Sequence, residues 1–313
     1  MPPEPTPRPG AAPVAPAPDS ALPTPRDLRV AAADGLSLHV VQWSREGVPF
    51  LFVHGFGNEA HIWDDFVPAL APHYAVHALD WRGHGDSDWH TDGAYDWDDH
   101  LRDLEQVVEG FGWQRFVLCG HSLGGRVALL YAAAHPEKLA GLVVVDTGPE
   151  HDPRGQLRIR MDAESQPDPS FENLAECQTM LAHQYAAALP SAIERMARHT
   201  TRQRADGRFV FKMDPKLRNF SARAEGMSND ELAAHDEALR ERLWAACRSV
   251  PCPTLVVRGA ASDILSADVA EAMVDDALAH GSLAVIGRAS HSVMTDNPDE
   301  FGRALEGFAL GEG

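Results

Sequence analysis

Short apolar runs recur along the chain and predict buried β-strands. Between these runs, apolar side chains return at helical spacing, as Leu101, Leu104 and Val108 do. Strands that alternate with amphipathic helices form a mostly parallel sheet with helices on both faces, so the pattern predicts an α/β fold. The apolar runs lie at residues 50–53, 75–79, 115–119, 142–145, 254–257 and 283–286.

The first two predicted strands, 28–30 and 36–43, follow a different rule. Only a short turn at Asp34 and Gly35 separates them. Because a tight turn joins antiparallel neighbours, we expect these two strands to pair antiparallel at the start of the sheet.

The strand–helix alternation stops between Glu150 and Val250, a segment rich in Ala, Arg, Glu and Gln. It contains no β-branched run of strand length, so we expect several helices. The segment falls between the sixth and seventh strands of the sheet. We therefore predict a helical cap at 149–250, inserted into a core formed by 27–148 and 251–313.

Residues 1–26 are mostly Pro and Ala. This composition cannot bury enough apolar surface to offset the cost of ordering, so we predict a disordered or extended tail. A polyproline ligand for a partner is the alternative. A secretory signal needs a basic start and a continuous apolar stretch, and this segment has neither.

The charge balance narrows the classes of function. The 313 residues include 27 Lys and Arg against 46 Asp and Glu, a net charge of −19. A surface this acidic repels phosphates and anionic lipids, so we expect no nucleic-acid and no membrane partner. No apolar run reaches the roughly 18–20 residues of a membrane span. The four cysteines form no CxxC pair, which argues against disulfides and zinc–thiolate sites and favours a cytoplasmic location.

The strongest chemical signal is GHSLGG at 120–125, which directly follows a predicted buried strand and precedes a predicted helix. A G-x-S-x-G motif in that context forms a sharp turn that exposes a nucleophilic serine, here Ser122. Flanking glycines are needed because side chains would clash in the turn. The helix that follows points its N-terminus at any oxyanion that forms.

A serine hydroxyl needs a base, and the base needs a carboxylate. His291 is the candidate base, because it follows the last predicted strand at the sheet edge where catalytic groups collect. Asp263 follows the next-to-last strand and is the preferred carboxylate. Asp146 also ends a strand and is its rival. Either choice gives the chain order Ser, Asp, His.

Two backbone N–H groups should stabilise the oxyanion. One belongs to Leu123, the residue after the nucleophile. The other should come from the loop after the 50–53 strand, which reads HGFGN at 54–58. Gly55 permits a close approach of the backbone, and we assign the second donor to Phe56.

These motifs together resemble the α/β-hydrolase superfamily, over about residues 27–310. The residues that carry the resemblance are His54 and Gly55, the DWRGHGDS segment at 80–87, the GHSLGG turn, Gly259 with Asp263, and His291. The resemblance implies a mostly parallel eight-stranded sheet and Ser-His-Asp chemistry without a cofactor. It implies structural rather than catalytic roles for Asp80, Arg82 and Asp86. Ala289 and Ser290 stand before the histidine where many relatives have glycine.

A serine at this turn disfavours the epoxide hydrolases and haloalkane dehalogenases of this fold, which carry aspartate there. We expect hydrolysis of a small ester, thioester or lactone through an acyl-enzyme. Three alternatives stay open: cleavage of a carbon–carbon bond in a diketone, a cofactor-free perhydrolase or haloperoxidase activity, and a small-molecule receptor on a hydrolase scaffold.

The predicted cap has nearly balanced charges in an otherwise acidic protein. Its arginines could face an anionic substrate group, but a solvated helical surface with i,i+4 ion pairs is the preferred interpretation. Its histidines His183, His199 and His235 show no ligand spacing, so we expect no metal. Either a monomer or a homodimer fits the sequence.

Overall fold

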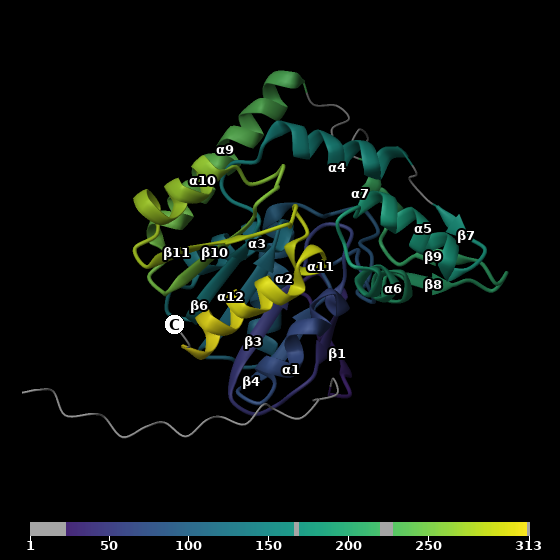
Figure 1. The fold of residues 1–313 in the computed structure, drawn as a ribbon, viewed down its shortest axis with the longest axis horizontal. Helices are drawn as coiled ribbons and strands as arrows, with labels where there is room; N and C mark the ends of the chain where they lie inside the picture. Colours follow the sequence, from purple (N-terminus) through teal and green to yellow (C-terminus); the bar gives the residue numbers. More distant parts are fainter. Residues whose placement is uncertain (1–22, 166–168, 220–227, 312–313) are drawn as a thin grey trace, which may run out of the picture.

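The computed structural model describes residues 23–165, 169–219 and 228–311. An eight-stranded sheet of order β1-β2-β4-β3-β5-β6-β10-β11 forms its centre (Figure 1). Strands β1, β2 and β4 pair antiparallel and all other neighbours pair parallel, which confirms the predicted fold class. The strands are β1 (Arg26–Ala31), β2 (Ser37–Gln42), β3 (Val48–Val53), β4 (Tyr74–Leu79), β5 (Phe116–His121), β6 (Leu139–Val145), β10 (Thr254–Gly259) and β11 (Gly281–Ile286).

The apolar runs of the central strands are buried because both faces of the sheet are covered there. In β3, Leu51 and Val53 face one hydrophobic cluster, whereas Phe50 and Phe52 face another. Successive side chains of a strand point to opposite faces, so a strand that is covered on both sides must be apolar at every position.

Helices cover each face of the sheet. One face packs against α2 (Trp97–Gly110), α3 (Leu123–Ala134) and the end of α9 (Asn229–Ser249), with α10 (Ala267–Ala272) and η2 (Met273–Ala277) beside them. The other face packs against η1 (Ala60–Phe66), α1 (Val67–Leu70), α11 (Val293–Asp296) and α12 (Pro298–Leu310). In Figure 1, α12 crosses in front of the sheet and α3 lies behind it.

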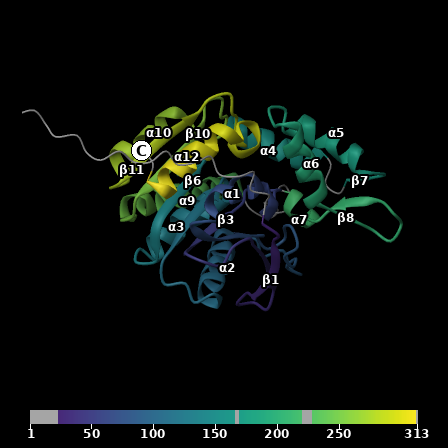
Figure 2. The same cartoon turned by 60° about the horizontal axis from the view of Figure 1, so that its bottom comes forward.

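The segment 149–250, called the insertion below, joins β6 to β10, and its part before residue 219 extends to one side of the sheet (Figure 2). Its helices are α4 (Pro153–Ser165), α5 (Leu174–Gln184), α6 (Pro190–His199), α7 (Pro215–Arg218) and α9. It also holds a three-stranded sheet of order β7-β9-β8, which the sequence analysis missed: β7 (Ser170–Phe171), β9 (Phe209–Phe211) and β8 (Thr201–Gln203). Strands of two or three residues are too short to leave a period-2 pattern.

The insertion is not uniform in its contacts. Helix α9 lies along α3, and Leu243, Ala246 and Cys247 belong to the hydrophobic cluster under the sheet. Helices α5 and α6 pack on each other, away from α9, and their residues Cys177, Leu181 and Ile193 belong to the hydrophobic cluster on the opposite face of the sheet. The division into a core and one cap at 149–250 stays a prediction, and α9 is the element that fits it least.

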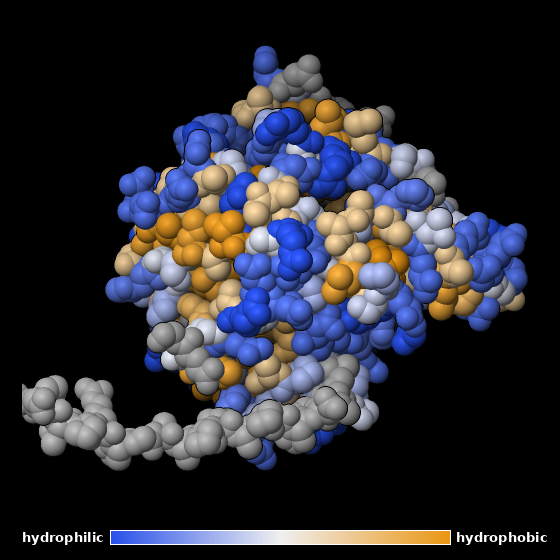
Figure 3. Space-filling view, in the orientation of Figure 1, coloured by the Kyte–Doolittle hydropathy of each residue, from blue (hydrophilic) through white to orange (hydrophobic). Residues whose placement is uncertain are grey.

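The predicted tail at 1–26 lies largely outside the described residues, and β1 begins at Arg26. No helix within the described ranges is long and apolar enough to cross a membrane. The face seen in Figure 3 is mostly hydrophilic, with an apolar patch over the edge strand β11, where Val285 is half exposed. The cytoplasmic location and the oligomeric state stay predictions.

The buried histidine His77 should make the fold sensitive to acid. Burial lowers its pKa to about 4, while its ring bonds the Ala75 carbonyl. The unfolded chain, with an ordinary histidine pKa near 6.5, therefore takes up a proton first, and stability falls as pH drops from about 6.5 to 4. The loss is on the order of 3 kcal/mol. Urea unfolding of His77→Gln against wild type across this range should show a shallower pH slope in the variant; equal slopes would contradict this reading.

Candidate active site

The turn between β5 and α3 holds Ser122 in a strained conformation. Its φ is 52° and its ψ is −115°, in the left-handed half of the backbone map where side chains are disfavoured. Gly124 is required by close packing, because a Cβ there would lie 2.5 Å from the Val53 carbonyl oxygen. The sequence therefore forms the predicted sharp turn, with Ser122 at the carboxyl edge of the sheet.

Three side chains form a hydrogen-bonded chain at this edge. Ser122 Oγ lies 3.0 Å from His291 Nε2, and His291 Nδ1 lies 2.8 Å from Asp146 Oδ2. The Asp146 carboxylate accepts a hydrogen bond from Nδ1–H, which leaves the Nε2 lone pair facing the serine hydroxyl. The structure thus brings Ser122 and His291 together, and both are largely buried.

Asp146 is fully buried and receives two further hydrogen bonds. The backbone N–H of Gly259 donates to Oδ1 over 2.7 Å, and the Ser262 hydroxyl donates to Oδ2 over 2.6 Å. Burial raises the pKa of this carboxyl, while His291 and the other two donors act against that rise. Three donors on one carboxylate fix its position beside the imidazole.

The predicted contact between Asp263 and His291 is not present, and this corrects the sequence analysis. The Asp263 carboxylate instead forms a bidentate ion pair with Arg158 of α4, at 2.6 and 2.9 Å. The hydrogen bond from Arg158 lowers the pKa of this carboxyl, as does the guanidinium charge. Asp263 therefore connects the insertion to the core, and its rival Asp146 takes the place beside the imidazole.

The order of the strands in the sheet explains why Asp146, and not Asp263, lies beside His291. The sequence analysis placed the acid in the loop after β10 because sequential strands usually adjoin. In the sheet, however, β6 lies between β5 and β10. The loop that carries His291 crosses the end of β10, where a Cβ on Gly259 would lie 2.0 Å from the Ser290 carbonyl oxygen. This crossing brings the imidazole to the end of β6, next to the serine.

The loop after β3 lies against the serine turn. A Cβ on Gly55 would lie 2.6 Å from His121 Nδ1 and 3.0 Å from Ser122 Cβ, so the close approach requires glycine. Phe56 follows it and lines the same pocket as Ser122. Leu123 is the first residue of α3, where helical N–H groups have no carbonyl partner within the helix. The assignment of the Phe56 and Leu123 N–H groups as oxyanion donors stays a prediction.

His121 is a site residue that the sequence analysis did not single out. Its Nε2 lies 3.0 Å from the His291 carbonyl oxygen, and its ring lies 4.7 Å from the His291 ring. Burial lowers the pKa of His121, as does the neighbouring His291, so its ring stays neutral and donates one hydrogen bond. It ties the end of β5 to the loop of the catalytic histidine. Its only signal was its place in the G-x-S-x-G motif.

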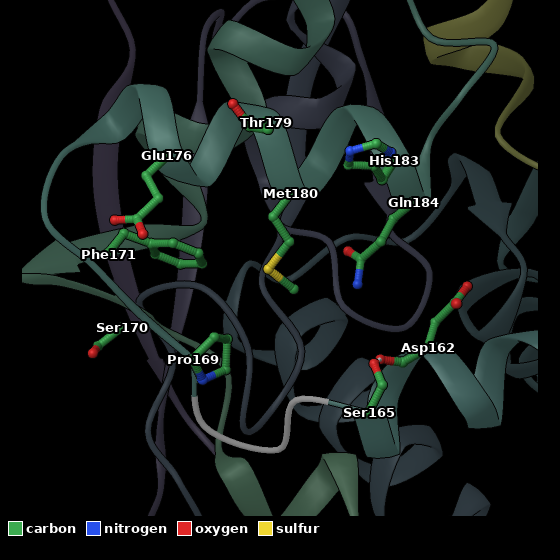
Figure 4. Close-up of a pocket in the computed structure, with 10 residues that line it drawn as sticks. All are labelled: Asp162, Ser165, Pro169, Ser170, Phe171, Glu176, Thr179, Met180, His183 and Gln184. Carbon is green, nitrogen blue, oxygen red and sulfur yellow. Dashed lines mark hydrogen bonds between the residues drawn. The ribbon is translucent and has the colours of Figure 1, made fainter.

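A pocket of about 420 Å³, called the serine pocket, opens over this chain of side chains. Core residues Phe56, Ser122 and His291 line one side, and Tyr185, Phe211 and Arg218 of the insertion are among those that line the other. A second pocket of about 570 Å³ adjoins it, since Asp162, His183 and Gln184 line both. Figure 4 shows this outer pocket between α5, the end of α4 and β7.

The DWRGHGDS segment makes structural contacts, as expected. The Arg82 guanidinium forms a buried bidentate pair with Asp103, both bonds at 2.6 Å. Asp80 accepts hydrogen bonds from the backbone N–H groups of Ala60 and Asp86. Burial raises its pKa, but these hydrogen bonds, the one from His39 and the charges of His39 and His54 together lower it to about 2. These contacts join neighbouring loops of the core, and none of them involves Ser122.

Removing the Ser262 hydroxyl should slow the reaction without unfolding the protein. A hydrogen bond to a charged group is worth roughly 1.5–3 kcal/mol, so Ser262→Ala should lower kcat about tenfold or more. The weaker hold on the Asp146 anion should also shift the acid limb of the pH–rate profile upward. Ser266→Ala, which removes only the N-cap of α10, is the matched control. Equal profiles for the two variants would contradict a role for Ser262.

Comparison with known proteins places this geometry in context. A family model described as the alpha/beta hydrolase fold matches residues 48–171. The chain is 28% identical over 264 residues to 2-(acetamidomethylene)succinate hydrolase of Mesorhizobium japonicum, covering 84% of this chain and 88% of that protein. It is 26% identical over 288 residues to the esterase Rv0045c of Mycobacterium tuberculosis, covering 88% and 86%.

Other matches agree. The zebrafish serine hydrolase-like protein (Danio rerio) is 36% identical over 102 residues, and that match spans 32% of this chain and 31% of the relative. The solved structure of an alpha/beta hydrolase from Novosphingobium aromaticivorans superposes with a TM-score of 0.73 at 29% identity, covering 91% of this chain and 99% of that one. With its sheet order, its strained serine turn and these relatives, the chain belongs to the α/β-hydrolase superfamily and is a hydrolase of that fold.

Proposed function

We propose that the protein is a serine hydrolase that cleaves a small ester, thioester or lactone through an acyl-enzyme. The observation that carries the proposal is the hydrogen-bonded chain from Ser122 through His291 to Asp146. It combines a nucleophile, a base and a group that fixes the base, in the order that acyl transfer requires. An esterase among the relatives supports the same class of reaction.

In the acylation step, Ser122 Oγ attacks the substrate carbonyl carbon and its proton passes to His291 Nε2. The carbonyl oxygen becomes an oxyanion, which the N–H groups of Phe56 and Leu123 would stabilise. The tetrahedral intermediate then collapses. The bond to the leaving group breaks, and His291 gives its proton to the departing oxygen or sulfur.

Water reverses these roles in the second step. His291 takes a proton from water, whose oxygen attacks the acyl carbon, and the collapse returns the proton to Ser122 Oγ and releases the acid. Throughout, the Asp146 carboxylate holds the imidazole with its proton on Nδ1 and stabilises the imidazolium. The partner is therefore a small acyl substrate, and the proposed chemistry needs no cofactor.

The proposal is tested by turnover of p-nitrophenyl acetate. A serine hydrolase should release nitrophenol in a burst equal to the enzyme concentration, followed by steady turnover, and a rapid quench should trap a protein heavier by one acetyl group. A receptor on a hydrolase scaffold would instead show a single slow turnover with a thermal shift. A carbon–carbon hydrolase would cleave ring-cleavage diketones faster than the ester. Either result would overturn the ester assignment.

The pocket wall favours a substrate with a carboxylate as the second candidate. Arg218 is a buried cation in the wall of the serine pocket, and its guanidinium lies 4.5 Å from the centre of the Phe211 ring. The planar guanidinium matches the geometry of a carboxylate. The succinate hydrolase among the relatives carries such a substrate in its name.

The expected result is a higher kcat/KM for mono-p-nitrophenyl glutarate than for p-nitrophenyl valerate. The preference should disappear in Arg218→Gln and persist in Arg160→Gln, which changes an exposed arginine of α4. A charge-assisted hydrogen bond is worth roughly 1.5–3 kcal/mol, so the preference should be at least about tenfold. Faster cleavage of the neutral ester by the wild type would reject this substrate class.

A further inference from the structure

Two histidines and an aspartate meet at a contact between the core and the insertion, away from the residues that line the serine pocket. They are His61 and Asp64 of η1 and His199, the last residue of α6. One ligand atom from each lies within 4.8 Å of the other two. Two imidazoles and a carboxylate are a set of ligands that first-row transition metals prefer.

The local structure explains why these side chains converge. Element η1 is a 3₁₀ helix with three residues per turn, so His61 and Asp64 lie above one another on one face. Their side chains are in contact, with His61 Nδ1 at 3.1 and 3.2 Å from the two Asp64 oxygens. Both side chains are largely shielded from solvent but not sealed, with exposed fractions of 16% and 12%. An ion would have an entry path.

A second contact aligns the two elements. One turn before His199, the Arg195 guanidinium forms a bidentate pair with Asp65, at 2.6 and 2.8 Å. This pair fixes α6 against η1, so the approach of His199 to His61 is built into the packing. The rings of the two histidines stack with centroids 3.9 Å apart. Trp43 packs edge-on against the outer side of His61, at 5.8 Å.

Carboxylates beside the stacked rings favour a bound cation. The Asp64 carboxylate contacts the His61 ring, and the Glu59 carboxylate accepts a hydrogen bond from the His61 backbone N–H over 2.7 Å.

We propose that His61, Asp64 and His199 form a binding site for a Zn²⁺ ion that links α6 of the insertion to η1 of the core. The ion replaces the proton that His61 shares with Asp64. Tetrahedral zinc places its ligand atoms roughly 3.3 Å apart, so the site closes by rotation of the His199 ring out of the stack. A water molecule completes the fourth position.

A second cluster of similar composition is a poorer metal site, because its carboxylate oxygens already have partners. His39, Asp80 and Asp86 also lie within ligand distance of one another. Both Asp80 oxygens are already occupied, however, by the N–H groups of Ala60 and Asp86 and by the His39 ring. A metal there would have to break these buried bonds. Metal binding by His61, Asp64 and His199 needs only the loss of the proton between His61 and Asp64 and the rotation of the His199 ring.

The position of the site gives it a consequence for the reaction. Element η1 begins two residues after Asn58, the end of the loop that carries Phe56. Helix α6 belongs to the insertion, whose other segments line the serine pocket. A bound ion therefore holds the insertion against η1, the element that follows the loop to which we assign one oxyanion donor.

Metal binding to the untagged full chain tests the proposal, with Zn²⁺ alone as the probe. Titration calorimetry should show one equivalent bound, and Zn²⁺ should raise the Tm, because a ligand that binds only the folded state stabilises it. His199→Ala and Asp64→Asn should each lower the affinity more than about 100-fold, since the loss of outer contacts alone costs roughly 10–100-fold. Co²⁺ should occupy the same site and give a visible absorption spectrum that both variants lose.

Two control variants show whether the bound Zn²⁺ lies at the proposed site. His280→Ala removes an exposed histidine and should bind Zn²⁺ as the wild type does. His291→Ala removes the candidate base and should also keep one equivalent, which separates this site from the catalytic one. Loss of binding in His291→Ala with binding kept in His199→Ala would place the ion in the serine pocket and overturn the proposal. Absence of stoichiometric binding in a wild type with a normal Tm would overturn it as well.

Discussion

Replacing Ser122 with alanine should lower kcat for p-nitrophenyl acetate roughly 10⁴–10⁶-fold, because a triad that loses its nucleophile keeps only binding and oxyanion stabilisation. Nothing in the packing opposes the change. The hydroxyl contacts His291 and the backbone of residue 122 keeps its place in the turn. Unfolding by urea should therefore give a stability close to that of the wild type, or higher if the smaller side chain relieves strain.

The matched control is Ser290→Ala in the same pocket, whose hydroxyl bonds Asp296 at 2.5 Å rather than the chain of catalytic side chains. It should keep turnover within about tenfold of the wild type, because the hydrogen bond that it loses to the Asp296 carboxylate lies outside the catalytic chain of side chains. Wild-type turnover in Ser122→Ala would remove the serine turn from the mechanism. An equal loss in both variants would point to general damage of the pocket.

The second large effect separates the two carboxylates. Asp146→Asn should lower kcat by on the order of 10⁴-fold, because an asparagine amide donates to Nδ1 and leaves the imidazole proton on Nε2, where it faces the serine. Asp263→Asn should leave kcat nearly unchanged. It removes the ion pair with Arg158, whose two partners are both partly exposed, so the cost in stability is small.

Both variants should be measured on one chromogenic ester, together with their urea unfolding curves. A change in KM for Asp263→Asn is compatible with its place in the pocket wall. A large loss of kcat at Asp263 with near-normal turnover at Asp146 would reverse the assignment. A loss of folding in Asp146→Asn would be resolved by Ser262→Ala, which weakens the same carboxylate from outside.

The features that could be predicted from the sequence are those that depend on local interactions. The turn at Ser122 was predictable because its requirements are local: a buried strand, glycines that avoid the clash, and a helix start. The central strands were predictable because burial on both faces makes them almost wholly apolar. The place of His291 followed from its position after the last strand.

The acid was not predictable, because it depends on the order of strands in the sheet. Asp146 and Asp263 both follow strands, and both preserve the order Ser, Asp, His along the chain. Only the position of β6 between β5 and β10 decides between them. In the structure, Asp146 has a φ of 48°, which turns the chain sharply out of the strand at this residue. This conformation could not be seen in the sequence.

The contact between His61 and His199 was even harder to predict from the sequence. The two residues are 138 positions apart, and the sequence analysis expected no metal because no ligand spacing was visible. The pairing depends on how α6 packs on η1, which the ion pair of Arg195 with Asp65 fixes. Pockets and sites formed between the core and the insertion share this dependence on tertiary packing.

The most direct test of the central claim is to map the residue that becomes covalently modified. The full-length protein is treated with a fluorophosphonate, digested, and analysed by mass spectrometry. The proposed mechanism predicts one adduct per chain, on Ser122, formed quickly in the wild type and in Asp263→Asn and slowly in Asp146→Asn. An adduct on another residue, or rapid labelling of Ser122 in Asp146→Asn with slow labelling in Asp263→Asn, would contradict it.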